Sequence, residues 1–267
     1  MPELPDVEGF KKVLVKHALR KTIDAVTVQD RRILDTASVP SFTRRLTGAK
    51  LTSARRHGKY LLAAIDHGGW LVLHFGMSGA LIFVPSQAGE PPFTRVRFDF
   101  ARNGALAYTN KRMIGRVSLA DDADGFIAQE NLGPDALDPH FGVDAFAAAL
   151  AGTSRSIKSV LMDQEIVAGI GNIFSDEILF QARVDPALAA DQLKSGEVKR
   201  LHAVMRHVLE EAVRRGAGAE EFAERMPKGA LLPERKKGGH CPRCGTLLKM
   251  FKLAGRTAYC CPHCQKC

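Results

Sequence analysis

Residues 1–7 read Met-Pro-Glu-Leu-Pro-Asp-Val, and the interpretation of the whole chain starts from this stretch. Once Met1 is removed, Pro2 presents a free secondary amine beside the carboxylate of Glu3. An α-amino group has a pKa of about 7.7–8.0, so a sizeable fraction is unprotonated at neutral pH. Such an amine can attack an electrophilic sugar carbon and form an imine, as lysines do with carbonyl substrates. The simpler alternative is that Pro5 only starts a helix, where its missing N–H costs nothing.

The chain that follows predicts one helix and then many short strands. Apolar residues recur at helical spacing over residues 6–21. Alternating apolar and polar residues then indicate strands at 23–28, 50–53, 60–65, 70–74, 80–84 and 95–100. Short strands with tight turns favour a β-sandwich or barrel, which we expect to occupy residues 1–131.

The second half of the chain is predicted to be helical. Residues 132–150 read as a linker and a first helix, and residues 151–235 as a helical domain. Gly169 and Gly171 interrupt the pattern and lead into another helix, which predicts a helix-turn-helix arrangement. The backbone N–H groups of that turn, with the side chain of Asn172, could hold a phosphate; the alternative is a plain glycine-rich connection. Residues 187–215 predict a long amphipathic helix, and 216–239 a mobile connector.

Composition indicates a globular protein that is attracted to polyanions. The 267 residues carry a formal net charge of +9, and nucleic acid is the leading partner for such a surface. The sequence has no apolar run of about 18 residues and no signal-peptide pattern. We therefore expect a cytoplasmic protein that does not enter a membrane.

The cysteines predict a metal site in the last domain, residues 236–267. Cys241, Cys244, Cys261 and Cys264 have the spacing C-x2-C-x16-C-x2-C, which is typical of a four-thiolate zinc site on a β-hairpin. Such a zinc ion is structural, because four thiolates leave no open position for water. Other arrangements remain open. Cys267, Cys260 or His263 could replace a ligand, or the cysteines could form disulfides or act as redox thiols.

Two stretches within the strand-rich half also stand out. Residues 55–59 form a basic cluster directly before a predicted strand. This cluster is either a solvated turn or a phosphate contact. Met77 lies between two glycines, so it is displayed on a loop and could act as a wedge, although methionine more often fills a core.

Four separated segments together resemble the formamidopyrimidine-DNA glycosylase and endonuclease VIII family. They are residues 2–5, 58–59, 164–180 with Gly-Ile-Gly-Asn at 169–172, and 256–264. The resemblance extends over nearly the whole chain. It implies an α+β fold with an N-terminal helix on a β-sandwich, a helix-two-turns-helix domain and a C-terminal zinc-bound hairpin. It also implies that damaged duplex DNA lies in a cleft.

The resemblance further implies roles for individual residues. Pro2 would attack C1′ of the damaged nucleotide and Glu3 would act as general acid and base. The implied catalytic set is Pro2, Glu3, Lys59 and Arg256, and the implied DNA-binding set is Met77, Arg112, Ile114, Lys158 and Asn172. Met77 and Arg112 would fill the space left by the extruded nucleotide.

The sequence departs from the family pattern in ways that affect substrate choice. Asp6 stands where the family usually has Glu, and Ile114 replaces the aromatic residue of the wedge loop. Residues 216–239 are shorter than the usual segment and lack its aromatic stretch, the region associated with oxidised purines. The preferred lesion is therefore not assigned.

Three functional hypotheses follow. The leading one is a bifunctional glycosylase and AP lyase for oxidised bases in duplex DNA, with one structural Zn2+ and a monomeric state. The second is a protein of the same fold that binds damaged or abasic DNA, either without catalysis or as a lyase only. The third, a zinc-bearing nucleic-acid or ribosome-associated module, leaves Pro2, Glu3 and Lys59 unexplained.

Overall fold

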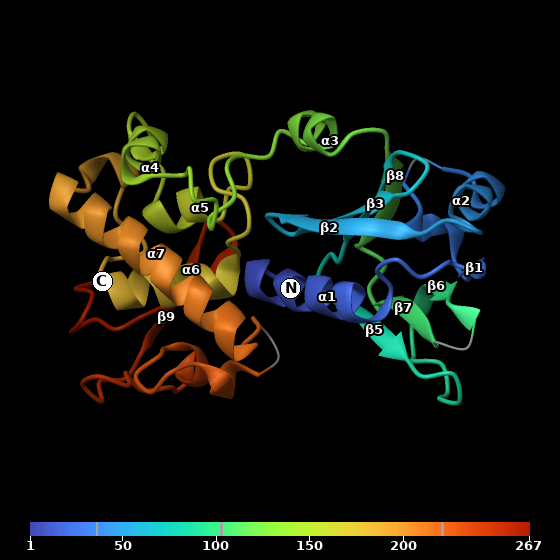
Figure 1. The fold of residues 1–267 in the computed structure, drawn as a ribbon. Coiled ribbons are helices and arrows are strands. Elements are labelled where there is room, and N and C mark those ends of the chain that lie inside the picture. Colours follow the sequence, from blue (N-terminus) through green and yellow to red (C-terminus); the bar gives the residue numbers. More distant parts are fainter. Residues whose placement is uncertain (36, 102–103, 220–221) are drawn as a thin grey trace. The chain divides into compact units, whose positions relative to one another are not determined.

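The computed structural model describes residues 1–35, 37–101, 104–219 and 222–267, which form two compact units (Figure 1). The first unit comprises residues 1–2 and 6–130, and the second comprises residues 3–5 and 131–267. Among the described residues, none of the helices combines the length and apolarity that crossing a membrane requires.

The described strands of the first unit form two antiparallel four-stranded sheets. Their strand orders are β1-β6-β7-β5 and β2-β3-β4-β8. The strands are β1 (Ala25–Val28), β2 (Leu51–His57), β3 (Tyr60–Ile65), β4 (Trp70–His74), β5 (Gly79–Val84), β6 (Thr94–Asp99), β7 (Ala105–Asn110) and β8 (Arg116–Ala120). The helices are α1 (Leu4–His17), the 3-10 turn η1 (Arg31–Ile33), α2 (Val39–Leu46) and α3 (Ala123–Gln129).

Alternation along the strands explains the sandwich. In β6, Thr94, Val96 and Phe98 are buried and the residues between them are partly exposed, as expected for a strand with one face on a core. The core of this unit joins apolar residues of both sheets with α1 and α2, among them Leu14, Phe42, Leu73, Phe98 and Val117. The predicted β-sandwich with an N-terminal helix is confirmed.

Several elements of the first unit escaped the sequence patterns. Strand β7 is buried at all six positions, so it shows no alternation that could reveal it. Helix α2 is short, and its start is marked by Ser38, whose hydroxyl accepts a hydrogen bond from the Ser41 backbone N–H. Helix α1 begins at Leu4 and ends at His17, earlier at both ends than the predicted 6–21.

The second unit is mainly helical and ends in a hairpin. Its apolar core includes Leu4 together with residues from four helices, such as Phe146, Val160, Phe174 and Leu209. The elements are α4 (Val143–Leu150), α5 (Ile157–Leu161), α6 (Asn172–Ala182), η3 (Ala190–Gln192), α7 (Ser195–Arg215), η4 (Ala223–Arg225), η5 (Leu232–Glu234), β9 (Lys249–Leu253) and β10 (Arg256–Cys260). The predicted long helix is thus shorter at its start, where the 3-10 turn η3 precedes it.

The segment 216–239 is not a plain mobile connector. Residues 220–221 lie outside the described residues, but the rest contains η4 and η5 and contributes to the core. Met226, Ala230 and Leu232 are buried, and Leu232 N–H donates to the carboxylate of Glu177 at 2.8 Å. The prediction failed because these few apolar residues lie in a glycine- and proline-rich context without a periodic pattern.

Candidate functional site

The carboxylate of Glu3 is held by the turn that leads into α6. It accepts hydrogen bonds from the backbone N–H groups of Gly171 at 2.7 Å, Ile173 at 2.8 Å and Phe174 at 3.1 Å. The residue is 1 % exposed. The first turn of a helix has N–H groups without helical partners, and a carboxylate there also meets the positive end of the helix dipole. The structure therefore fixes Glu3 at the amino end of α6, directly after Pro2 in the chain, and Pro2 itself is half-buried.

The two glycines of the turn are required by this packing. Gly169 has φ +116°, and a Cβ there would lie 2.7 Å from Cδ1 of Leu4. A Cβ on Gly171 would lie 2.5 Å from Cδ of Glu3. The backbone N–H of Leu4 also donates to the Gly169 carbonyl at 3.0 Å. The sequence Gly-Ile-Gly-Asn thus builds a close-fitting cradle for residues 3–4.

Asn172 follows this cradle as the first residue of α6. Its side chain is half-buried, and its Oδ1 is a buried oxygen that has no hydrogen-bond partner among the described residues. Its backbone carbonyl accepts from Nζ of Lys158 at 3.1 Å and from Arg235 at 3.3 Å. Asn172 is therefore oriented through its main chain.

Lys158 has a different position from the one expected. It is 0 % exposed and forms an ion pair with the buried carboxylate of Asp176. Burial lowers the pKa of Lys158, whereas the charge of Asp176 opposes that change. Lys158 thus pairs with Asp176 in the core of the second unit, and its role in DNA binding stays a prediction. Its contact with Asn172 is structural.

In the first unit, the structure brings Met77 and Arg112 together. Nη1 of Arg112 lies 3.8 Å from Sδ of Met77, and the Arg112 backbone N–H donates to Oγ of Ser78 at 3.1 Å. Met77 belongs to the loop between β4 and β5, and Arg112 to the loop between β7 and β8. Ile114, in the second of these loops, is 51 % exposed. We call these two loops, residues 75–79 and 110–115, the paired loops.

Buried polar contacts hold the paired loops in place. Nδ2 of Asn110 donates to the Phe75 carbonyl at 3.0 Å and lies 3.2 Å from the Tyr108 hydroxyl. The Tyr108 hydroxyl donates to the His74 carbonyl at 2.7 Å. A Cβ on Gly115 would lie 2.0 Å from that hydroxyl, so only glycine fits there. The loops are therefore rigid supports for the exposed side chains of Arg112 and Ile114.

Lys59 occupies a two-residue hairpin loop between β2 and β3. Gly58 takes φ +54°, which a two-residue hairpin loop often needs at its first position. Lys59 is 7 % exposed, and Arg56 pairs with Glu8 at 3.0 Å, so this basic cluster is not a simple solvated turn.

A polar network around Tyr60 was not predicted from the sequence. The Tyr60 hydroxyl donates a hydrogen bond to the Glu130 carboxylate at 2.8 Å. Nη2 of Arg116 donates to the Tyr60 hydroxyl and to the Glu130 carboxylate, each at 3.1 Å. His74 contacts the ring of Tyr60, and within the part of the chain that the structure describes its buried Nδ1 has no hydrogen-bond partner. Burial, with the nearby cations Arg116 and Lys59, lowers the pKa of His74 to about 4. Tyr60, His74 and Arg116 lie on three different strands and Glu130 follows helix α3, so no local motif could reveal the network.

The four predicted cysteine ligands meet in the last domain. The ligand atoms of Cys241, Cys244, Cys261 and Cys264 all lie within 4.8 Å of one another. Three Sγ–Sγ distances are 3.8, 3.5 and 3.6 Å, close to the roughly 3.8 Å edge of a tetrahedron with Zn–S bonds of about 2.3 Å. Cys260 and Cys267 form a disulfide with each other and are therefore not ligands, and His263 is not part of the cluster found among the described residues.

Arg256 is the first residue of β10 and is exposed. Its Cα partner across the hairpin is Leu253. The hairpin β9–β10 thus presents Arg256 near its tip, while its other end is fixed by the cysteine cluster.

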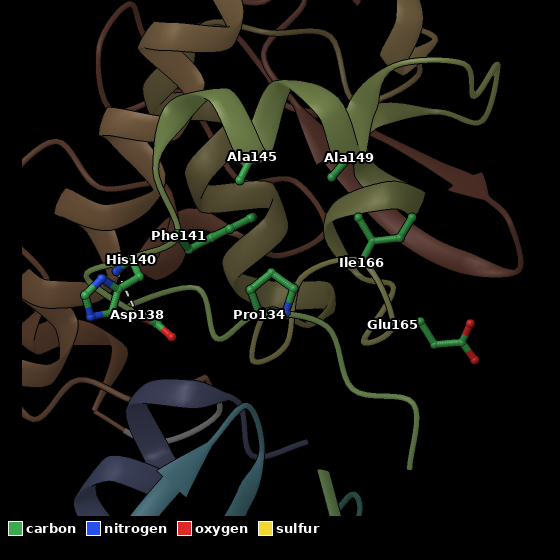
Figure 2. Close-up of a pocket in the computed structure, with 8 residues that line it drawn as sticks. All are labelled: Pro134, Asp138, His140, Phe141, Ala145, Ala149, Glu165 and Ile166. Carbon is green, nitrogen blue, oxygen red and sulfur yellow. Dashed lines mark hydrogen bonds between the residues drawn. The ribbon is translucent and has the colours of Figure 1, made fainter. Parts of the chain in front are cut away.

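A cavity of about 540 Å3 lies elsewhere in the second unit. Figure 2 shows Ala145 and Ala149 projecting from α4 toward the ring of Phe141 and the side chain of Ile166. Its lining is Pro134, Asp138, His140, Phe141, Ala145, Ala149, Glu165 and Ile166. The lining includes Glu165 and Ile166 of the segment 164–180, but none of the catalytic, DNA-binding or zinc-binding residues predicted from the sequence lies in this cavity.

Comparison with known proteins gives matches over the whole chain. Three family models match in order: the formamidopyrimidine-DNA glycosylase N-terminal domain at residues 1–117, the H2TH domain at 132–224, and the zinc finger found in FPG and IleRS at 238–266. A formamidopyrimidine-DNA glycosylase from Moorella thermoacetica is 38 % identical over 260 residues, which cover 94 % of this chain and 95 % of the relative.

Two solved structures of the Lactococcus lactis enzyme Fpg (MutM) have the same fold. One is a complex with DNA that contains N7-benzyl-Fapy-dG, with a TM-score of 0.89, 27 % identity and full coverage of both chains. The other is bound non-covalently to DNA with an AP site, with a TM-score of 0.88, 28 % identity, and coverage of 99 % of this chain and 100 % of that one.

Proposed function

Because the chain belongs to the formamidopyrimidine-DNA glycosylase family, we propose that it excises oxidatively damaged bases from duplex DNA and then cleaves the abasic site. The observation that carries this proposal is the anchored carboxylate of Glu3, with its three backbone hydrogen bonds, directly after Pro2 in the chain. Removal of Met1 would make the nitrogen of Pro2 a free secondary amine. The relatives named for this activity and the solved complexes with damaged or abasic DNA support it.

The chemistry begins with a nucleotide outside the helix. A base inside a duplex hides its glycosidic bond, and extruding it costs a few kcal/mol, less for a damaged pair. The lone pair of the Pro2 nitrogen then forms a bond to C1′, and the base leaves with the electron pair of the glycosidic bond. Glu3 serves as general acid and base for the accompanying proton transfers.

The same intermediate explains strand cleavage. After the sugar ring opens, the iminium at C1′ makes the 2′ proton acidic. Loss of that proton drives the electrons toward C3′, and the 3′ phosphate leaves with the C3′–O bond pair. Water then releases Pro2 from the product. One nitrogen thus serves both reactions, which is why an imine-forming amine suits a bifunctional enzyme.

The remaining site residues hold DNA in our proposal. Lys59, Asn172 and Arg256 bind phosphates on either side of the extruded nucleotide, and the two basic residues lower the cost of developing negative charge. The paired loops carry Met77, Arg112 and Ile114 into the vacated space in the duplex. Apolar side chains can enter between bases in this way. Arg112, which contacts Met77, would supply a polar donor.

The zinc ion has a structural role. The zinc-finger match and the four clustered thiolates support one tetrahedral Zn2+, which leaves no coordination position for water. When bound, it fixes the ends of the hairpin whose strand β10 begins with Arg256. We place the protein in the bacterial cytoplasm, acting as a monomer on chromosomal DNA.

A borohydride trapping experiment tests the proposal. Duplexes that contain 8-oxoguanine, a formamidopyrimidine, an oxidised pyrimidine or an abasic site are incubated with the protein, and cleavage and covalent adducts are scored. We expect both with at least one damaged base and with the abasic site. Pro2→Gly, or retention of Met1, should abolish the adduct. Pro5→Ala is the matched control, because Pro5 has no free amine, and it should keep trapping.

Three results would overturn parts of the proposal. Binding to abasic duplex without any cleavage would support the non-catalytic damage-binding alternative, and cleavage of abasic DNA alone would support a lyase-only protein. Full trapping by protein that retains Met1 would exclude Pro2 as the nucleophile.

A further inference from the structure

The carboxylate of Asp176 is a buried junction of three segments in the second unit. Asp176 is 0 % exposed within α6. Its carboxylate forms an ion pair with Lys158 from α5. It also accepts a hydrogen bond from Nε of Arg235 at 2.8 Å and one from the backbone N–H of Tyr259 in β10 at 3.3 Å. Residues 59 and 83 positions away in the sequence thus bond to this one side chain.

Arg235 connects the junction to two further backbone groups. The residue follows η5, and its side chain is only 12 % exposed. Its Nη2 lies 3.3 Å from the Asn172 carbonyl and 3.3 Å from the Thr257 carbonyl. Its guanidinium also lies 4.9 Å from the centre of the Tyr259 ring. A planar fork with five donors can make these contacts together, and a lysine ammonium cannot.

Both backbone partners of Arg235 are close to proposed phosphate-binding residues. Asn172 is itself one of them, and Thr257 directly follows Arg256. One guanidinium therefore links the start of α6 to the start of β10.

Stability alone is a poor explanation for this arrangement. Lys158 and Arg235 bring two positive charges to one carboxylate in the interior. Taking ions out of water costs several kcal/mol each, and buried ion pairs can often be replaced by apolar residues without loss of stability. Their best-attested use is to select one arrangement over others. Here the arrangement selected is that of α6 relative to the hairpin.

We propose that Arg235 is a positioning residue that makes Asn172 and Arg256 bind DNA phosphates as one unit. The proposal deepens the proposed function and rests on it. Without Arg235, α6 and β10 each keep their own fold, but the two groups no longer match the spacing of phosphates on one strand. The expected defect is loss of cooperation between the two contacts.

The chain offers a matched control in Arg243. Its Nη1 donates to the Phe180 carbonyl at 2.9 Å, and its guanidinium lies 4.3 Å from the centre of the Phe180 ring. Arg243 thus ties the zinc-binding segment to the opposite, carboxyl-terminal part of α6 through the same chemistry. Among the described residues, its hydrogen bonds go to Phe180 and Gln181 and not to Asn172 or Thr257.

The test is a double-mutant cycle on DNA binding. Dissociation constants are measured for a duplex with a tetrahydrofuran abasic analogue, which cannot form the imine. Arg256→Ala should weaken binding about tenfold in the wild-type background, as expected for loss of one charged hydrogen bond. In an Arg235→Met background the same change should cost less than about threefold, because the contact is already lost. In an Arg243→Met background it should still cost about tenfold.

Further measurements separate positioning from unfolding. Zinc content and thermal melting are recorded for each variant, and Arg235→Lys serves where Arg235→Met does not fold. Arg235→Lys keeps a charge opposite Asp176 but loses the fork, so it should also reduce the cost of Arg256→Ala. An unchanged tenfold cost in either Arg235 background would overturn the proposal. Wild-type protein that binds no abasic duplex would instead refute the proposed function.

Discussion

The two units hold their candidate DNA-binding groups by different means. In the first unit, the paired loops rest on an apolar sandwich and are fixed by close contacts of neutral groups, with Asn110 and Tyr108 at their base. In the second unit, charged groups and thiolates fix the segments that carry these groups. Glu3 binds the start of α6, Asp176 bonds to three segments, and four cysteines meet at the base of the hairpin.

The difference has a physical cause. A β-sandwich buries enough apolar surface to fix its own loops, since two sheets share one large core. The zinc hairpin has only a small apolar cluster around Phe180, Leu231 and Leu248. Such a small element needs a metal or covalent links to stay ordered. The first unit should therefore respond to steric changes and the second to removal of metal, charge or disulfide.

Removal of zinc should have the largest effect and should act on the second unit only. Structural zinc sites in small domains contribute about 10–16 kcal/mol of apparent binding free energy, so the hairpin should lose its order without the ion. Hydrogen exchange should show loss of protection in β9 and β10 of chelated protein, while β3 and β7 stay protected. Zinc addition should restore both protection and DNA binding. If the hairpin stays protected without zinc, the proposed dependence of the second unit on its metal is wrong.

Acidification should act on the first unit through His74. Its pKa is about 4 in the folded protein against 6.5 for a free side chain. The unfolded chain therefore binds more protons between these values, and the stabilisation present above pH 6.5 is lost as pH falls toward 4. The full loss is roughly 3 kcal/mol. Urea unfolding at pH 7 and pH 4.5 should show a smaller difference for His74→Leu than for wild type, and equal differences would contradict this assignment.

Gly115→Ala should destabilise the first unit by steric conflict at the paired loops. The added Cβ would meet the Tyr108 hydroxyl at 2.0 Å and Asn110 Nδ2 at 2.2 Å. Overpacking of this kind typically costs about 1–3 kcal/mol, and we expect the upper end. Gly89→Ala is the control, since a Cβ there has no neighbour within 4 Å. Similar melting temperatures for the two variants would show that the loops yield easily.

Loss of the Cys260–Cys267 disulfide should have the smallest effect of the four and act on the second unit. The bond closes a short ring that contains the zinc ligands Cys261 and Cys264. A ring of this size stabilises by about 2 kcal/mol in the chain-entropy model. Cys267→Ser should therefore release zinc to a chelator faster than oxidised wild type. Reduced wild type should release zinc as fast as the variant. Equal rates of zinc release from oxidised wild type, reduced wild type and Cys267→Ser would contradict this role of the disulfide.

The sequence predicted the fold well where local patterns exist. The strands at 60–65 and 70–74 were placed correctly because their edges are marked by turns and their residues are strongly apolar. Strand β7 and helix α3 were missed, since the first is buried throughout and the second is short. The cysteine ligands were predictable because metal geometry requires their spacing.

The candidate site was predictable only in part. Glu3 and Met77 were singled out from their sequence context, and Arg112 was identified through resemblance. The contacts of Glu3 with residues 171–174 span about 170 positions, so no local sequence pattern predicts them. Lys158 was assigned to DNA binding through resemblance, and its burial against Asp176 has no local sequence signal because the two residues lie on different helices. Arg235 was overlooked because it lies in an irregular segment whose packing depends on distant backbone carbonyls.

The central claim is that the imino nitrogen of Pro2 bonds to the sugar while Glu3 stays fixed at the start of α6. The most direct measurement is tandem mass spectrometry of the peptide that remains attached to sugar after borohydride reduction of an abasic-DNA reaction. Our account predicts that the added mass is on the nitrogen of residue 2. A modification on Lys59 or any other lysine, with residue 2 unmodified, would contradict it.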